Sequence, residues 1–274
     1  MNNVIRTTSQ TSTNPPLAIR TIGNGPPVIC LHALGHDSGD FDPLVARLSD
    51  RFRFILVDWP GHGAAGLDMA PVSANRYAEL LDLALPALNL DTPIVIGNSI
   101  GGGAAILYAS RHPVRGVVLC NSAGLLEVTP AATRICNMFA RLFSGGERGA
   151  FWFPAFYALY YRIVLVTPAA RARRSQIVAN GPRLAKFLRE AWQSFGRPDA
   201  DIRATAASLT APVWVAWAIR DKVLQLKASL PAIKMLKNYR LSKFDAGHSA
   251  FVEQPEAFAA QFAEWAAGLP VKSS

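Results

Sequence analysis

The chain has 274 residues, of which half are hydrophobic and 17% are charged, and its formal net charge is +9. This length suits one large α/β domain, or a core domain that carries an insertion. No segment has the roughly 20 apolar residues of a membrane span, and the three cysteines lack the CxxC spacing of a zinc site. No nucleic-acid-binding motif accompanies the basic charge.

Short apolar runs alternate with helical patterns along most of the chain. Residues 1–16 are polar and predict a flexible lead-in without a signal-peptide stretch, so we expect a cytoplasmic protein. Runs with the length and continuity of strands buried on both faces lie at 27–31, 54–57, 93–96, 114–119 and 212–217. Further strands are expected at 17–22 and 239–244, and helices at 41–48, 74–88, 101–111, 230–236 and 255–267. The alternation predicts a mostly parallel central sheet flanked by helices.

The alternation stops between residues 124 and 209. This segment has no buried-strand run, and prolines and the pairs Gly145-Gly146 and Gly181-Pro182 punctuate its helical patterns. We predict an α-helical cap at 124–209, inserted into a core of residues 17–123 and 210–270 and covering the carboxyl edge of the sheet. Residues 124–205 hold twelve Lys/Arg and five Asp/Glu. This excess fits either a solvated helical surface or the attraction of an anionic substrate.

Ser99 stands in the motif Gly-Asn-Ser-Ile-Gly, between a predicted strand and a predicted helix. In this setting GxSxG forms a tight turn that exposes the serine hydroxyl as a nucleophile. Gly97 and Gly101 leave room where a side chain would collide with a neighbouring strand or helix. Ser99 itself is expected in a strained backbone region. A glycine-rich structural turn is the alternative, and the strand–turn–helix context favours the nucleophile.

A serine hydroxyl needs a base that takes its proton. Of the five histidines, only His248 lies late enough for the chain order Ser, Asp, His. Asp221 follows a predicted strand after a short turn, and we predict that it orients His248. Asp245 is the rival carboxylate, and we expect it to cap a loop instead. The predicted catalytic residues are therefore Ser99, Asp221 and His248.

Two backbone N–H groups should stabilise the oxyanion of the reaction. One belongs to Ile100, directly after the nucleophile. The other comes from the loop after the strand at 27–31, where Leu34 is the first choice and Ala33 the alternative. His32 is expected to brace this loop by hydrogen bonding. Asp58 is expected to accept hydrogen bonds from the backbone of the turn that follows it.

These residues together resemble the α/β-hydrolase fold family, from about residue 17 to residue 269. The matching motifs are HALG, DWPGHG, GNSIGG, WAIRD and AGHSAFVEQPEAF, in that order along the chain. The resemblance implies a helical cap at the position of the insertion. The chain departs from the family at Ala33 and at Ala218, where glycine is common. Epoxide hydrolases and haloalkane dehalogenases carry aspartate at the position of Ser99, so the resemblance does not extend to their chemistry.

Three functions remain open at this point. The first is hydrolysis of carboxylic esters of small to medium apolar or anionic substrates through an acyl-enzyme, with an apolar pocket from residues such as Phe151, Trp152, Phe156 and Tyr160. The second is carbon–carbon bond hydrolysis of an anionic dienoic acid, gripped by cap arginines. GNSIGG and CNSAGL resemble the meta-cleavage-product hydrolases, which commonly have an aromatic residue at the position of Ser249. The third is a receptor-like protein that binds a ligand and hydrolyses it slowly. Each implies a small-molecule partner, and none implies a metal or an organic cofactor.

Overall fold

The computed structural model describes residues 15–270, so residues 1–14 of the predicted lead-in lie outside the described part. Within this described range, seven strands form one sheet in the order β1-β3-β2-β4-β5-β6-β7. Their bounds are β1 (Ala18–Ile22), β2 (Pro27–Leu31), β3 (Arg53–Asp58), β4 (Ile94–Asn98), β5 (Gly116–Cys120), β6 (Val213–Ala218) and β7 (Tyr239–Phe244). Only β1 pairs antiparallel, with β3, and every other neighbouring pair is parallel. The predicted, mostly parallel sheet is thus confirmed.

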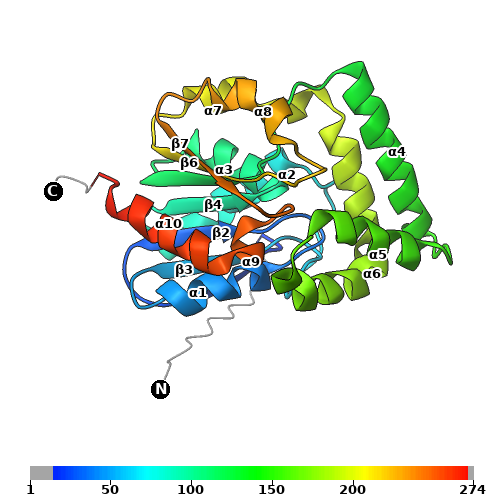
Figure 1. The fold of residues 1–274 in the computed structure, drawn as a ribbon, viewed down its shortest axis with the longest axis horizontal. Helices are drawn as coiled ribbons and strands as arrows, with labels where there is room; N and C mark the ends of the chain where they lie inside the picture. Colours follow the sequence, from blue (N-terminus) through cyan, green and yellow to red (C-terminus); the bar gives the residue numbers. More distant parts are fainter. Residues whose placement is uncertain (1–14, 271–274) are drawn as a thin grey trace.

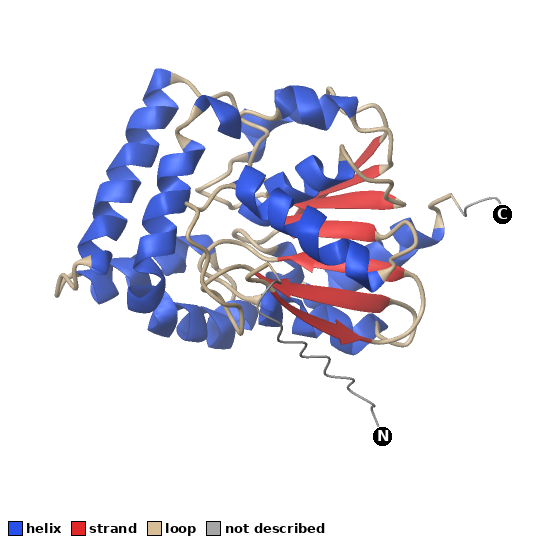
Figure 2. Cartoon of the chain, turned by 180° about the vertical axis from the view of Figure 1, so that it is seen from behind, coloured by secondary structure: helices blue, strands red, loops and turns tan. Residues whose placement is uncertain are grey.

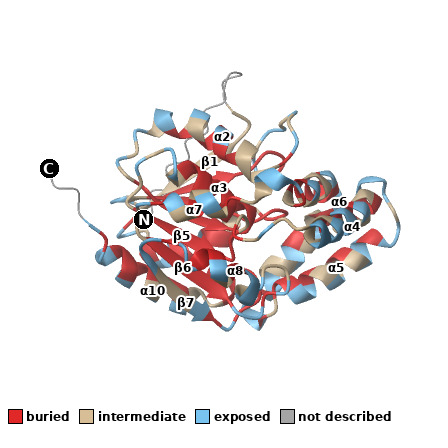
Figure 3. Cartoon of the chain, turned by 90° about the horizontal axis from the view of Figure 1, so that it is seen from above, coloured by how far each residue is buried: buried red, intermediate tan, exposed pale blue. Residues whose placement is uncertain are grey.

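Helices cover both faces of the sheet. One face carries α1 (Asp42–Leu48) and α10 (Pro255–Ala267), and the other carries α2 (Ala74–Ala84) and α3 (Ile100–Ala109), as Figures 1 and 2 show from opposite sides. α8 (Leu226–Ile233) joins β6 to β7, and the short α9 (Ala250–Glu253) precedes α10. Every residue of β4, β5 and β6 is buried, as Figure 3 shows for β5 and β6. Burial on both faces explains why β5 and β6 are continuous apolar runs and why β4 is apolar up to its last residue, Asn98.

The segment between β5 and β6 is helical. It contains α4 (Pro130–Glu147), α5 (Phe153–Val164), α6 (Arg171–Phe195) and α7 (Arg203–Ser208), here called the helical insertion. α4 begins where the Thr129 hydroxyl accepts a hydrogen bond from the Ala132 N–H at 3.2 Å and proline takes the first helical position. α4, α5 and α6 lie beyond one end of the sheet, on the right of Figure 1 and the left of Figure 2.

Glycine and proline do not interrupt the insertion helices as the sequence pattern indicates. α6 runs through Gly181 and Pro182, and α4 includes Gly145 and Gly146. A Cβ atom at Gly181 would lie 2.2 Å from the Tyr157 ring. These glycines therefore allow aromatic rings to pack close to a continuous helix. α8 begins four residues before the predicted start at residue 230, with Pro231 inside the helix.

Three further findings concern the composition of the chain. Among residues 15–270, no helix combines the length and the apolar character needed to cross a bilayer. Cys30 and Cys120 are buried free thiols, as predicted, and Cys136 is also buried and unpaired. In the same described range, no group of three or more His, Cys, Asp or Glu side chains is arranged to hold a metal ion.

Candidate active site

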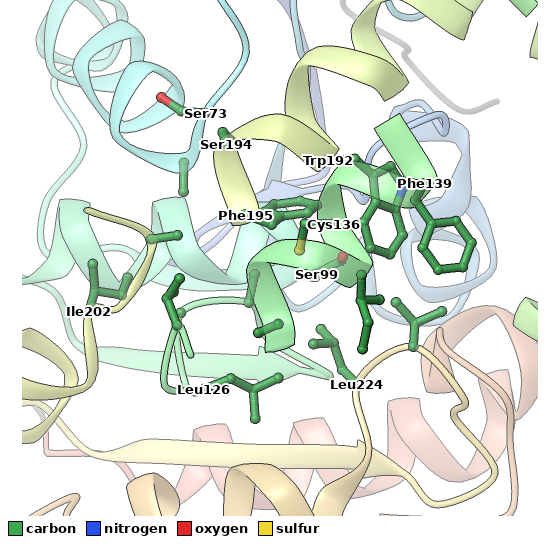
Figure 4. A pocket seen from close by; sticks show the side chains of 18 of the residues that line it. Ser73, Ser99, Leu126, Cys136, Phe139, Trp192, Ser194, Phe195, Ile202 and Leu224 are labelled. Carbon is green, nitrogen blue, oxygen red and sulfur yellow. The ribbon is translucent and has the colours of Figure 1, made fainter. Parts of the chain in front are cut away.

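Ser99 occupies a strained turn between β4 and α3. Its backbone has φ 56° and ψ −121°, outside the regions that non-glycine residues ordinarily adopt, as the sequence predicts. A Cβ at Gly97 would lie 2.3 Å from the Gly101 carbonyl oxygen, and one at Gly101 would lie 2.4 Å from the Leu31 carbonyl oxygen. Only glycine at both positions lets the turn close. The Ser99 hydroxyl faces a cavity and makes no hydrogen bond among residues 15–270 (Figure 4).

Asp221 and His248 form a buried pair at the ends of β6 and β7. His248 Nδ1 lies 2.7 Å from Asp221 Oδ2. Burial favours the neutral imidazole, but the Asp221 carboxylate outweighs it and raises the pKa of His248 above its usual value. Because Nδ1–H donates to Asp221, Nε2 is left to accept a proton. Asp245 forms an exposed ion pair with Arg220 at 2.9 Å instead, so the structure places Asp221 and not its rival on His248.

Two asparagines hold these residues, and sequence reasoning did not assign them a role. Asn121 donates a 2.7 Å hydrogen bond to Asp221 Oδ2. Asn98 donates to the His248 carbonyl oxygen at 3.0 Å and accepts from the Ser249 hydroxyl at 2.7 Å. No direct hydrogen bond joins the Ser99 hydroxyl to His248, and Asn98, its chain neighbour, connects the two loops. The available sequence signal was the Asn-Ser pair that occurs twice, as Asn98-Ser99 at the end of β4 and as Asn121-Ser122 directly after β5.

Amides that could bind an oxyanion lie at the start of α3 and in the loop after β2. Neither the Leu34 nor the Ile100 N–H is used in a hydrogen bond within residues 15–270. The carbonyl oxygens of Leu31 and His32 lie within 2.8 Å of a Cβ built on Gly101, so this loop passes against the first turn of α3. The Leu34 and Ile100 N–H groups therefore lie on two segments that pack against each other next to Ser99.

Buried histidines brace the loop after β2. His32 Nδ1 lies 2.7 Å from the Ala33 carbonyl oxygen, and its Nε2 accepts from the Trp59 N–H at 3.2 Å. His62 Nε2 accepts from the Gly35 N–H at 3.1 Å. Burial, with His32 nearby, lowers the pKa of His62 to about 3, so His62 is a neutral acceptor. These contacts confirm the predicted bracing role of His32 and keep Gly35, next to Leu34, in place.

Asp58 fixes the next turn, as the sequence predicts. Its Oδ1 accepts from the Ser38 N–H at 2.7 Å, and its Oδ2 accepts from the Ala64 N–H at 3.1 Å. One carboxylate therefore joins the turn after β3 to the segment that follows the Leu34 loop.

An ionic cluster ties that segment to α6 of the helical insertion. Arg173 contacts Asp40 Oδ1 at 2.5 Å and Asp37 Oδ1 at 2.7 Å, and His36 Nδ1 lies 2.6 Å from Asp40 Oδ2. Burial alone would raise the pKa of the Asp40 carboxyl, but His36 and Arg173 bring it well below its usual range. Asp40 is therefore a buried, charged anchor for the insertion.

Glu253 ties the His248 loop to the same insertion. Its Oε1 accepts from the three successive amides of residues 247–249 at 2.8 to 3.4 Å. Its Oε2 accepts from the N–H groups of Val166 and Thr167, between α5 and α6, at 2.8 and 3.0 Å. One buried carboxylate thus satisfies five backbone donors from two segments. The available sequence signal for this role was the position of Glu253 five residues after His248.

A cavity of about 350 Å³ opens between the core and the helical insertion, with Ser99 in its wall. Figure 4 shows Ser99 facing the same space as Cys136, Phe139, Trp192 and Phe195. Most lining groups are apolar, and the charged lining residues are Glu127, Asp199 and Lys222.

The predicted pocket residues need correction. Of the four aromatics named from the sequence, Tyr160 lines the cavity, but Phe151, Trp152 and Phe156 do not. Phe151 is 94% exposed, because it lies in the turn between α4 and α5. No arginine lines the cavity in the described part of the chain, so the arginine grip on a carboxylate expected for a dienoic acid is not present there.

Known proteins share both the sequence pattern and the fold. The model of the Alpha/beta hydrolase family matches residues 28–261. A pimeloyl-[acyl-carrier protein] methyl ester esterase of Chromobacterium violaceum is 29% identical over 268 residues, which cover 90% of this chain and 97% of that protein. The structure of an esterase from Exiguobacterium antarcticum is 19% identical, with a TM-score of 0.79 over 92% of this chain and 96% of the other. An enol-lactonase from Burkholderia xenovorans is 20% identical, with a TM-score of 0.74 over 90% and 95%.

Proposed function

The chain belongs to the alpha/beta hydrolase family and is a hydrolase, and we propose that it cleaves carboxylic esters with Ser99, His248 and Asp221 as its catalytic triad. The observation that carries this proposal is the position of Ser99. Ser99 has a strained backbone, its hydroxyl makes no hydrogen bond within residues 15–270, and it faces an apolar cavity. Asn98, the residue before Ser99, donates a hydrogen bond to the carbonyl oxygen of His248, whose ring contacts Asp221.

The proposed reaction proceeds through an acyl-enzyme. His248 Nε2 takes the proton of the Ser99 hydroxyl while Ser99 Oγ bonds to the ester carbonyl carbon. The N–H groups of Leu34 and Ile100 donate to the oxyanion that forms. When the carbon–oxygen bond to the leaving alcohol breaks, His248 returns the proton to that alcohol. Water then attacks the acyl-enzyme by the same route, and Asp221 holds the imidazolium in both steps.

We infer that the cavity receives a small to medium apolar acyl or alkyl chain, covered by a cap of residues 124–209. Its volume and its aromatic lining from Phe139, Tyr160 and Trp192 support this substrate class. The relative named as a methyl ester esterase supports an ester as the bond attacked. Carbon–carbon cleavage of a dienoic acid is less well supported, because no arginine among the described residues lines the cavity.

A fluorophosphonate probe and a panel of p-nitrophenyl esters, from acetate to laurate, test this proposal. The wild type should be labelled and should hydrolyse the esters. Ser99→Ala should lose the label and reduce kcat by about 10⁴-fold or more. Ser194→Ala is the matched control, because Ser194 also lines the cavity but donates its hydroxyl to the Ala191 carbonyl oxygen. It should keep both label and activity.

Three outcomes would contradict the ester proposal. Retained turnover in Ser99→Ala would exclude Ser99 as the nucleophile. A labelled wild type that cleaves a dienoic acid several orders of magnitude faster than any ester would favour carbon–carbon hydrolysis. Negligible turnover across the panel, with tight binding of one ligand, would favour the receptor-like function.

A further inference from the structure

The outer faces of α4 and α5 expose large apolar side chains. Ile135 and Met138 on α4, and Leu159 and Ile163 on α5, are each between 47% and 62% exposed. Spacings of three and four residues place each pair on one face of its helix. Soluble proteins seldom gather exposed apolar residues of this size unless the surface binds something.

The two apolar strips meet at the mouth of the cavity. Ile135 and Ile163 both line the cavity while remaining about half exposed. Just beneath them, the rings of Phe139 and Tyr160 make an edge contact across the two helices, with centroids 6.1 Å apart. The apolar interior of the cavity therefore continues onto the surface of the insertion.

Exposed arginines accompany both strips. Arg134 and Arg141, seven residues apart on α4, share one side of that helix, and Arg162 adjoins Ile163 on α5. None of the three makes an ion pair or a side-chain hydrogen bond within residues 15–270. Other arginines of the insertion do have partners: Arg189 pairs with Glu147, for example. The positive charge beside the strips is thus uncompensated.

We propose that this α4–α5 face, made of Ile135, Met138, Leu159 and Ile163 with Arg134, Arg141 and Arg162, binds the surface of an anionic lipid bilayer. The apolar residues enter the interfacial layer, and the arginines pair with the anionic headgroups around them. A second copy of the chain fits this face poorly, because a two-fold interface would bring the same unpaired arginines together. Binding here does not require the Ser99 chemistry. A protein bound through this face would direct the mouth of its cavity toward molecules dissolved in the lipid.

Vesicle sedimentation tests the proposal directly. The intact chain should bind vesicles of equal parts phosphatidylcholine and phosphatidylglycerol, should bind pure phosphatidylcholine weakly, and should be released by salt. Each arginine near an anionic surface strengthens partitioning about fivefold, so the triple variant R134Q/R141Q/R162Q should bind roughly 100-fold more weakly. The variant M138S/L159S should also bind more weakly, with its arginines intact.

The control variant removes the same amount of positive charge, three arginines, from a part of the surface outside the α4–α5 face. Arg51, Arg111 and Arg240 precede or begin strands, at the amino end of the sheet, away from the helical insertion. R51Q/R111Q/R240Q should bind the anionic vesicles several-fold more tightly than the face variant of equal net charge. Both triple variants should keep the wild-type rate on p-nitrophenyl acetate, a monomeric substrate. Their circular dichroism melts should stay within about 5 °C of the wild type, because the ion pairs that the control loses, Arg111–Asp82 and Arg240–Glu264, lie near the surface.

The proposal is overturned if the wild type does not bind the anionic vesicles, or if the two triple variants lose binding equally. It is also overturned if the face variant dissolves a homodimer seen by light scattering while vesicle binding is unaffected. A loss of ester hydrolysis in the Ser99→Ala protein with full vesicle binding would leave the docking surface supported.

Discussion

Replacing Glu253 by glutamine would put a donor where five backbone N–H groups converge on one carboxylate. The new NH₂ group must face either the three amides of residues 247–249 or the two of Val166 and Thr167. At least two buried N–H groups then lose their acceptor. Each unsatisfied buried donor costs about 1–3 kcal/mol, so the free energy of unfolding should fall by about 2–6 kcal/mol. Glu256→Gln is the control, because Glu256 is exposed and its one ion pair within residues 15–270 is with Arg47 at the surface.

Urea unfolding followed by tryptophan fluorescence measures the difference. The Glu253→Gln midpoint should fall with little change in the slope against urea, while Glu256→Gln unfolds at the wild-type midpoint. Glu253 also contributes to the raised pKa of His248, so its neutral replacement should move the acid limb of ester hydrolysis to lower pH. An unchanged midpoint in Glu253→Gln would refute the reasoning, since the five hydrogen bonds would then contribute nothing to stability.

Three further predictions follow from the site. Ester hydrolysis should fall as pH drops through the raised pKa of His248, because the protonated ring cannot accept the serine proton. Asp221→Asn should shift that limb to lower pH and reduce kcat about 10⁴-fold, and a kcat–pH profile with an unmoved limb would count against it. Arg173→Ala should lower the free energy of unfolding by about 3 kcal/mol, because the buried Asp40 carboxylate loses one of the two side chains that pair with it, and Arg173→Lys should lower it by less; equal thermal melts of the two variants would contradict this. Ala132→Phe should raise KM for long-chain esters but not for acetate, because Ala132 lines the cavity, whereas the exposed neighbour variant Ala131→Phe should not. Identical chain-length profiles would show that the acyl chain lies elsewhere.

The central sheet was predictable because local composition decides it. β4, β5 and β6 are buried on both faces, so β5 and β6 are apolar throughout, β4 is apolar up to Asn98 at its end, and the predicted runs agree within two residues at either end. The helical insertion was predictable only as helical. Gly181 looks like a helix break from composition, yet it is a contact point for the Tyr157 ring, which no local pattern contains.

In the candidate site, too, some residues could be predicted from local sequence and others could not. Ser99, Asp221 and His248 each follow a strand in a turn, so their positions can be read from local pattern and chain order. Glu253 and Arg173 act through partners on distant segments, and their roles depend on which loops the fold brings together. The prediction that Phe151, Trp152 and Phe156 line the pocket was wrong for a related reason. Composition identifies an apolar run, but the rotation of each insertion helix decides which rings face Ser99.

The carboxylates of Glu253 and Asp40 hold the helical insertion against the core, and this affects how the protein could be re-engineered. Exchanging residues 124–209 for the corresponding segment of a relative would remove the two amides that Glu253 holds and the guanidinium that neutralises Asp40. The recipient core would keep two buried carboxylates with incomplete partners. A workable chimaera must therefore import a donor pair and a cation at matching places, or carry compensating neutral residues at positions 253 and 40. Graft boundaries chosen by sequence alignment alone would miss this requirement.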